Sequence, residues 1–328
     1  MPYADLVGEL RGAVPKLPPD YAYTLVNRAY ADTRRKNLWS FQLFESNWFS
    51  PAVVNAGTVT TRQGSNQVVF NAAASAAILA LGLVPSPITS RQFRISVYTV
   101  YNIWGIDNNA GIVTLTLDRP MMESSVTASP YSIFQCYYPA PMKDFKAFLS
   151  VRDPTNRWTL CTTRNRDWVD EQDPQRENYT MPRYVVPSGT NQNPLATTYG
   201  WMMFELWGQP QYTLPYIIYG IRKGVDLMYD TDTLPSAIGE DCVAALARAY
   251  AYEWAEGNKG DVPRSQGSDF RFLIEEAKNQ YIRLWREYRR EDRELVDLWV
   301  TTRRSSVLVG AMSGYYNAFA GVASAGVD

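Results

Sequence analysis

The spacing of hydrophobic positions divides the chain into helical ends and a β-rich middle. Near the start, Ala22, Val26 and Ala29 repeat at intervals of three and four, as in a helix that buries one face. From about Trp39 the period changes towards two, which is typical of half-buried strands. After residue 237 the helical period returns. The predicted helices are 4–14, 21–37, 238–256 and 268–298, and Asp20 and Ser268 are the predicted N-caps of the second and fourth.

The β-rich middle contains two hairpin signals. Strands at 58–61 and 67–70 flank a turn-forming stretch, Arg62-Gln63-Gly64-Ser65-Asn66. A second turn, at 107–111, leads into Ile112–Leu117. Residues 170–200 are rich in Pro, Asn, Gln and Thr and are predicted to form one long loop. The remaining predictions are a short helix at 72–81 and strands at 93–103, 131–138, 158–162, 201–207 and 216–222.

These elements predict an α+β fold, with a helical domain of three to four helices interrupted by a large antiparallel β-rich insertion. A stretch of small and apolar residues follows the last helix. The predicted domains are the discontinuous helical domain 1–38 and 236–300, the β-rich insertion 39–235, and a C-terminal extended arm 301–328.

The predicted arm is too apolar for a free, solvated tail. Its residues from 305 on carry no charged side chain except Asp328, and exposing such a run would create an unusually large apolar patch. Folding back onto its own domain is one interpretation, and docking onto another subunit is the other. The predicted partner-binding residues are Val307, Leu308, Val309, Met312, Tyr315, Tyr316 and Phe319.

Composition argues against an active site. The chain has no histidine, which excludes Ser-His-Asp and Cys-His catalysis and histidine-ligated zinc. The acids near 167–173 lack the spacing of a calcium loop and are predicted to be solvated, while Asp226, Asp230 and Asp232 are predicted to form turns and caps. We therefore predict no catalytic activity, no metal and no cofactor.

Charge and cysteine usage restrict the partners and the compartment. The formal net charge of −1 argues against bulk binding of nucleic acid. Three scattered cysteines, Cys136, Cys161 and Cys242, indicate buried thiols in a reducing compartment. The N-terminus lacks the apolar core of a secretory signal, and no stretch is long enough to span a membrane. The excess of Trp and Tyr (10 and 22) favours large protein–protein interfaces.

Several segments together resemble one family, the head-to-tail connector (adaptor) proteins of tailed bacteriophages, in the subset with a large β insertion. Shared features are a helix ending in a Trp-led strand and a Leu-Pro step into an Ala-rich helix. The segments are LVNRAYADTRRKNLWSF (25–41), LTLDRP (115–120), FKAFLSVRDPTNRW (145–158), FELWGQPQYTLPYIIYGIRKGVDL (204–227) and DTLPSAIGEDCVAALARAYAYEWA (232–255).

This resemblance implies a structural virion protein at the head–tail junction, made in the bacterial cytoplasm. It implies a homo-oligomeric ring, typically of twelve subunits, that binds the portal ring and the tail or nozzle proteins. DNA would pass through its lumen without sequence-specific binding. A tail-tube or tail-completion protein is one alternative, and a non-viral carbohydrate-binding or enzymatic β protein is another.

Overall fold

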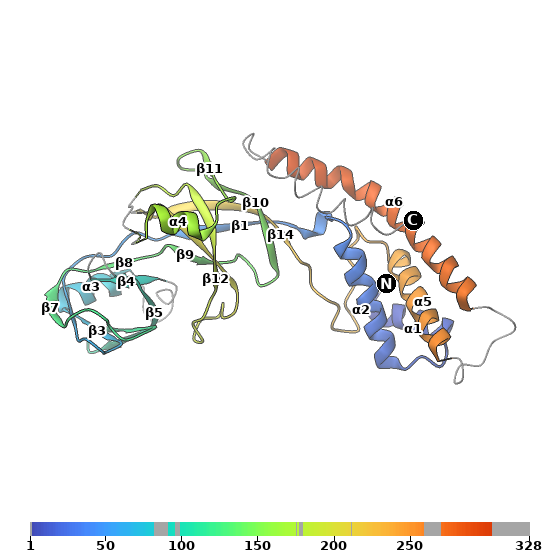
Figure 1. Ribbon diagram of the computed structural model, residues 1–328, viewed down its shortest axis with the longest axis horizontal. Coiled ribbons are helices and arrows are strands. Elements are labelled where there is room, and N and C mark those ends of the chain that lie inside the picture. The colour runs from blue at the N-terminus through green and yellow to red at the C-terminus, as the bar shows by residue number, and fades with distance from the viewer. Residues whose placement is uncertain are drawn as a thin grey trace. The chain divides into compact units, whose positions relative to one another are not determined.

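The protein is described by a computed structural model that covers residues 2–81, 91–95, 99–174, 176, 180–210, 212–258 and 270–303 (Figure 1). The fold is mixed α+β. The chain forms two compact units. One is built from the chain up to Phe44 together with the chain from Ile221 on, and the other is Glu45–Gly220. The sequence placed the two boundaries at 38/39 and 235/236, so the β-rich unit is shorter at both ends.

The first unit is helical, and its four long helices gather in one group in Figure 1. Its short η1 turn, Ser40–Gln42, precedes the first strand. The helices are α1 (Tyr3–Ala13), α2 (Pro19–Arg35), α5 (Glu240–Gly257) and α6 (Phe270–Arg303).

Nearby residues in the sequence explain which face α1 buries and where α2 begins. In α1, Leu6, Val7 and Leu10 share the buried face. Helix α2 starts at a Pro-Pro step because proline fits the first helical position, where no N–H partner is needed. Its N-cap is Pro18, so the prediction that Asp20 caps the helix is wrong; Asp20 lies in the first turn, where its charge suits the helix dipole.

Helix α5 is the centre of the helical core and contacts α1, α2 and α6. Its buried face is made largely of alanine, which lets neighbouring helices approach closely. The buried core includes Leu6, Leu10, Leu25, Val26, Trp39, Ile238, Val243, Leu246 and Tyr281.

Helix α6 has 34 residues and packs along α5. Its predicted cap, Ser268, lies outside the described residues. Tyr281 is buried, whereas Leu284 and Trp285 pack against the core but stay partly exposed. The sequence predicts that both are buried in the helical domain or against a neighbouring subunit, and within this unit their burial is partial.

The segment between the last strand and α5 is fixed to α2 by side-chain contacts. Arg34 donates to Asp226 and to the carbonyl of Val225, at 2.8 and 2.9 Å. Asn27 bonds both backbone groups of Leu227. The prediction of turns and caps holds for Asp232, which accepts backbone N–H groups of its own turn. The side chains of the other two aspartates contact α2 instead, because Asp226 pairs with Arg34 and Asp230 accepts from Tyr23.

Three sheets form in the described residues of the second unit. Their strand orders are β1-β14-β10-β11, β12-β13-β9 and β7-β2-β3-β6-β5-β4-β8. The strands are β1 (Leu43–Ser50), β2 (Val59–Thr61), β3 (Gln67–Phe70), β4 (Gln92–Arg94), β5 (Tyr101–Asn109), β6 (Ile112–Leu117), β7 (Val126–Ser129), β8 (Ser132–Phe134), β9 (Tyr137–Pro139), β10 (Phe145–Asp153), β11 (Trp158–Leu160), β12 (Tyr184–Thr190), β13 (Met202–Trp207) and β14 (Leu214–Arg222). Its helices are α3 (Ala72–Ala80) and α4 (Arg166–Gln172).

The seven-stranded sheet contains both predicted hairpins. Strand β2 pairs with β3, and β5 pairs with β6, antiparallel in each case. The turn between β5 and β6 is a tight hairpin turn, because Ala110 and Gly111 both adopt the positive φ that such turns require. Helix α3 is capped by Asn71 and buries Ala74 and Ile78 in the core of this sheet.

Three predictions in the β-rich middle are wrong. Residues 131–138 are not one strand, because β8 and β9 belong to different sheets. Residues 93–103 are likewise not one strand, because they include parts of β4 and β5, which pair with each other. The predicted loop 170–200 contains the end of α4 and strand β12, whose Val185 and Val186 are buried. Short strands whose partners lie far away in the sequence show little strand pattern in their own residues.

Candidate functional site

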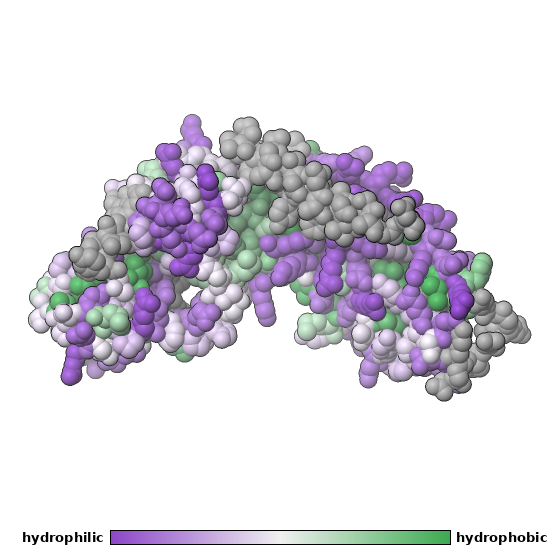
Figure 2. Space-filling model, viewed as in Figure 1, coloured by the Kyte–Doolittle hydropathy of each residue, from purple (hydrophilic) through white to green (hydrophobic). Residues whose placement is uncertain are grey.

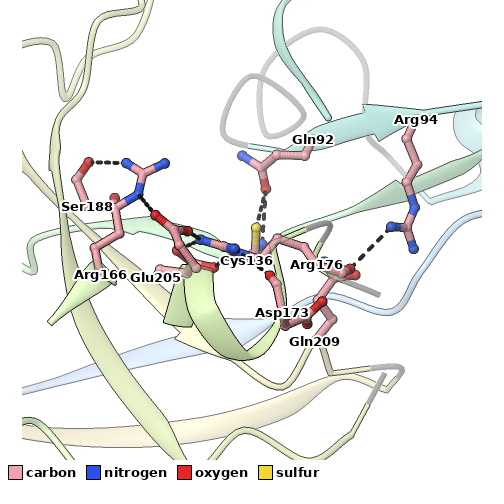
Figure 3. Close-up of polar contacts among 10 residues, drawn as sticks. Gln92, Arg94, Cys136, Arg166, Asp173, Arg176, Ser188, Glu205 and Gln209 are labelled. Carbon is pink, nitrogen blue, oxygen red and sulfur yellow. Dashed lines mark hydrogen bonds and ion pairs between the residues drawn. The ribbon is translucent and has the colours of Figure 1, made fainter. Parts of the chain in front are cut away.

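A buried polar cluster lies in the β-rich unit, where α4, β13 and the chain after α4 meet (Figure 3). Glu205 on β13 is fully buried, and Arg176 is 5% exposed. The two side chains form a two-point ion pair, and Arg176 also pairs with Asp170 on α4. A buried charge of this kind requires a partner, since removing it from water is costly.

Hydrogen bonds to the backbone extend the cluster to other strands. The carbonyl of Arg176 accepts from Arg94 on β4 at 3.2 Å and from Gln209 at 2.8 Å. Gln92 accepts from the backbone N–H of Cys136 at 3.0 Å. Figure 3 shows these contacts converging from separate strands, so the cluster fixes how the small sheets meet the large one inside this unit.

The electrostatics of the cluster follow from burial. Burial raises the pKa of the Glu205 carboxyl, and the bond to Arg176 offsets only part of that rise. For the Arg176 guanidinium, burial alone would lower the pKa, but its bonds to Glu205 and Asp170 outweigh burial and raise it. Arg176 therefore stays charged, and its pairs with Glu205 and Asp170 hold β13, α4 and the chain after α4 together.

A cavity of about 430 Å³ opens beside this cluster. Its walls carry arginines, carboxamides and hydroxyls together with Trp104 and Tyr137. Polar groups around an aromatic surface suit a polyhydroxylated ligand, because such ligands stack on rings and hydrogen-bond at their edges. The polar lining comprises Gln92, Thr99, Asn102, Arg119, Arg166, Asp170, Arg176, Ser188, Thr190, Asn191, Gln192 and Asn193.

No group of three or more potential metal ligands occurs in the part of the chain that the structure describes. The acids near 167–173 were predicted to be a solvated loop. They instead lie on and just after α4, and Asp170 pairs with both Arg166 and Arg176. Of the three cysteines, Cys136 and Cys242 are buried as predicted, while Cys161 is partly exposed.

On the helical unit, α6 carries a row of arginines on its solvent side, which we call the arginine ridge: Arg283, Arg286 and Arg290. All three are exposed, and none forms an ion pair with another described residue. Arg283 and Arg290 precede glutamates by four residues, which is the weaker order for an ion pair along a helix. Hydrophilic side chains cover much of the visible surface over α6 in Figure 2.

A groove of about 570 Å³ lies elsewhere on the helical unit, between α1, the start of α5 and one residue of α6. We call it the α1–α5 groove. Leu6, Leu234, Ile238 and Ala244 give it apolar walls. Its charged lining residues are Glu9, Glu240, Asp241 and Arg248, three carboxylates against one guanidinium.

Tyr288 of α6 forms one wall of this groove and packs over Gly239. Its hydroxyl donates to Asp241 at 2.8 Å. A Cβ at Gly239 would lie 1.9 Å from the Tyr288 ring, so only glycine fits there. The close approach fixes α6 against the start of α5 and gives the groove its shape.

The predicted partner-binding residues of the arm, Val307 to Phe319, lie outside the described residues. Sequence reasoning missed the Arg176–Glu205 pair, whose partners are 29 positions apart without a local motif.

A scan against protein-family models and a search of curated proteins found no match to this chain. No helix in the described ranges is both long and apolar enough to cross a membrane.

Proposed function

We propose that this chain is a structural adaptor of a tailed bacteriophage, which forms a ring between the portal and the tail and lets DNA pass through the lumen. The resemblance in sequence is the origin of the proposal. The observation that carries it is the discontinuous helical unit. Its helices α1 and α2 pack against α5, which packs along α6, although the β-rich unit separates α2 from α5 in the sequence. That organisation is what the resemblance implies for the adaptor domain.

The ring would be a homo-oligomer, typically of twelve copies, with the portal ring on one side and tail or nozzle proteins on the other. The exposed apolar side chains of α6, among them Phe272 and Leu295, support a helix that meets other protein surfaces. The role is structural, without a catalytic centre or a bound cofactor.

The decisive experiment is the mass of the purified chain, alone and mixed with the portal protein of the same phage. Light scattering and electron microscopy should reveal a ring in at least one of the two samples. A chain that stays monomeric in both contradicts the proposal. Binding to a tail protein without binding to portal would favour the tail-tube or tail-completion alternative.

The arm remains part of the proposal, with Val307, Leu308 and Val309 among its contacts to portal. Deleting 305–328 should leave the remaining helices folded but abolish attachment to the portal ring. Unchanged affinity for portal, or failure of the truncated chain to fold, would show that these residues belong to the core instead.

The cavity beside Arg176 favours a second candidate, a carbohydrate-binding protein. Its polar rim and its two aromatic residues are the supporting observation. Titration of the chain with neutral and acidic oligosaccharides, followed by calorimetry, tests it. Binding that is lost in Trp104→Ala, in a chain that forms no ring, would favour this candidate over the adaptor.

A further inference from the structure

We infer that the arginine ridge of one copy docks into the α1–α5 groove of a second copy, and that this contact repeats around the ring. The inference rests on the proposed function and names the contact that would close the ring. It starts from the ridge itself, where Arg283, Arg286 and Arg290 present three guanidinium groups within about 10 Å along the helix axis.

Unpaired guanidinium groups in a row need a partner that supplies carboxylates or phosphates. Phosphates are the poorer match here. Glu287, Glu291 and Glu294 lie beside the ridge on the same helix, and a nucleic-acid backbone along the ridge would meet them. A protein surface with a limited number of carboxylates matches the ridge without that conflict.

The α1–α5 groove offers such a surface. Glu9 pairs with Arg248, so the negative charge of the groove comes from Glu240 and Asp241, and it opposes the charge of the ridge. Its apolar walls match Ile282, which is 41% exposed beside the ridge, and the aliphatic stems of the arginines. The two surfaces are therefore complementary both in charge and in apolar contact.

The chain cannot make this contact with itself. Tyr288 forms a wall of the groove, and the ridge residues lie about 140–160° around α6 from Tyr288, at roughly 100° per residue. The ridge thus faces away from the groove of its own subunit. Two different patches on opposite sides of one unit give a head-to-tail contact, which closes into a ring when the rotation between copies allows.

The test uses two charge-reversed forms of the full chain. In the ridge-reversed form, R283E/R286E/R290E, a row of carboxylates would meet the acidic groove. In the groove-reversed form, Glu9→Arg and Glu240→Arg, a basic groove would meet the arginine ridge. Each form alone should lose the ring, because every contact around it becomes repulsive.

An equimolar mixture of the two forms should recover the ring. Copies would alternate, so the reversed ridge would sit in the reversed groove, and each remaining contact would be the original one. Mass photometry of each form and of the mixture measures ring formation. Portal is added to every sample if the unaltered chain forms a ring only in its presence. The matched control for the ridge-reversed form is R62E/K143E/R157E, which makes the same change in net charge as that form, on exposed residues of the β-rich unit, and should keep the ring.

Circular dichroism must show that both reversed forms stay folded. A ridge-reversed form that still makes rings, or a mixture of folded forms that does not, would overturn the inference while the adaptor proposal stands. An unaltered chain without a ring in either sample overturns both. Duplex DNA binding that depends on the ridge, with assembly unchanged, would assign the ridge to the lumen instead.

Discussion

The two units of the chain fill their interiors with different side chains. In the helical unit, the central helix α5 buries six alanines, whose small side chains let neighbouring helices approach closely. In the β-rich unit, aromatic rings carry the packing. Phe70, Phe93 and Tyr131 contact one another in the large sheet, and Phe145, Phe148 and Phe204 do so in the smaller ones.

This difference makes the two cores sensitive to opposite changes. An aromatic core loses most when a ring is removed, since the cavity that remains cannot collapse completely. An alanine core loses most when a side chain is enlarged, since the helices must then move apart. Substitutions that delete volume in one unit and add it in the other can therefore test whether the comparison holds.

Removing a ring from the β-rich unit should have the largest effect. Phe93 is fully buried and stacks with Tyr131 at 6.2 Å between ring centroids. We expect Phe93→Ala to cost about 3–5 kcal/mol in the free energy of unfolding. Chemical denaturation followed by circular dichroism measures it. Phe49→Ala, at an exposed ring of the same unit, is the control and should change stability by less than about 1 kcal/mol.

Breaking the buried ion pair should cost nearly as much in the same unit. Arg176→Ala leaves the Glu205 carboxylate buried and uncompensated, and we expect a loss of about 3–5 kcal/mol. The exposed Arg166, which contacts the same Asp170, is the matched control, and Arg166→Ala should cost about 0–1 kcal/mol. Equal losses in the two variants would mean that burial does not determine how much an ion pair contributes to the free energy of unfolding.

The sequence predicted the helical unit better than the β-rich one for a physical reason. A helix is specified by neighbours three and four positions away, so Leu6 and Leu10 indicate α1, and the Pro-Pro step marks the start of α2. In the β-rich unit, the hairpins are the elements that are likewise specified by residues close together in the sequence. The turn at Ala110 and Gly111 joins strands that pair directly.

Elsewhere in the β-rich unit, strands depend on partners far along the chain. Tyr138 pairs with Phe204, and Phe93 pairs with Ile133, so neither short strand carries a signal of its own. The buried cluster shows the same limit, because Arg176 and Glu205 become partners only when α4 meets β13. The α1–α5 groove also could not be predicted, since it depends on Tyr288 packing over Gly239.

Enlarging an alanine in the helical unit should have an intermediate effect. Ala245 is fully buried in α5, where Leu is as good a helix former but needs more room. We expect Ala245→Leu to cost about 1–3 kcal/mol. Ala13→Leu, at the exposed end of α1, is the control and should be close to neutral. A neutral Ala245→Leu would mean that the helical core is looser than its alanine content indicates.

The smallest effect concerns the buried phenols, which alkaline titration detects. Burial raises the pKa of Tyr3 in the helical unit and of Tyr131 in the β-rich unit to about 12, while the pKa values of Tyr250 in the helical unit and Tyr216 in the β-rich unit are raised further. An unfolded tyrosine titrates near about 10. Because the folded pKa is the higher one, the stability from each buried phenol is fully present below pH ~10 and is lost as pH rises through the folded pKa.

Each unit should therefore ionise one group of buried phenols in the folded state at pH about 12, Tyr3 in the helical unit and Tyr131 in the β-rich unit. Tyr250 and Tyr216 should ionise only together with unfolding. Phenolate absorbance recorded beside circular dichroism distinguishes the two steps. In Tyr3→Phe, one phenol should disappear from the earlier step and the later step should not change. If the phenols of one unit all titrated before those of the other, the contrast between the two cores would extend from packing to the ionisation of their tyrosines.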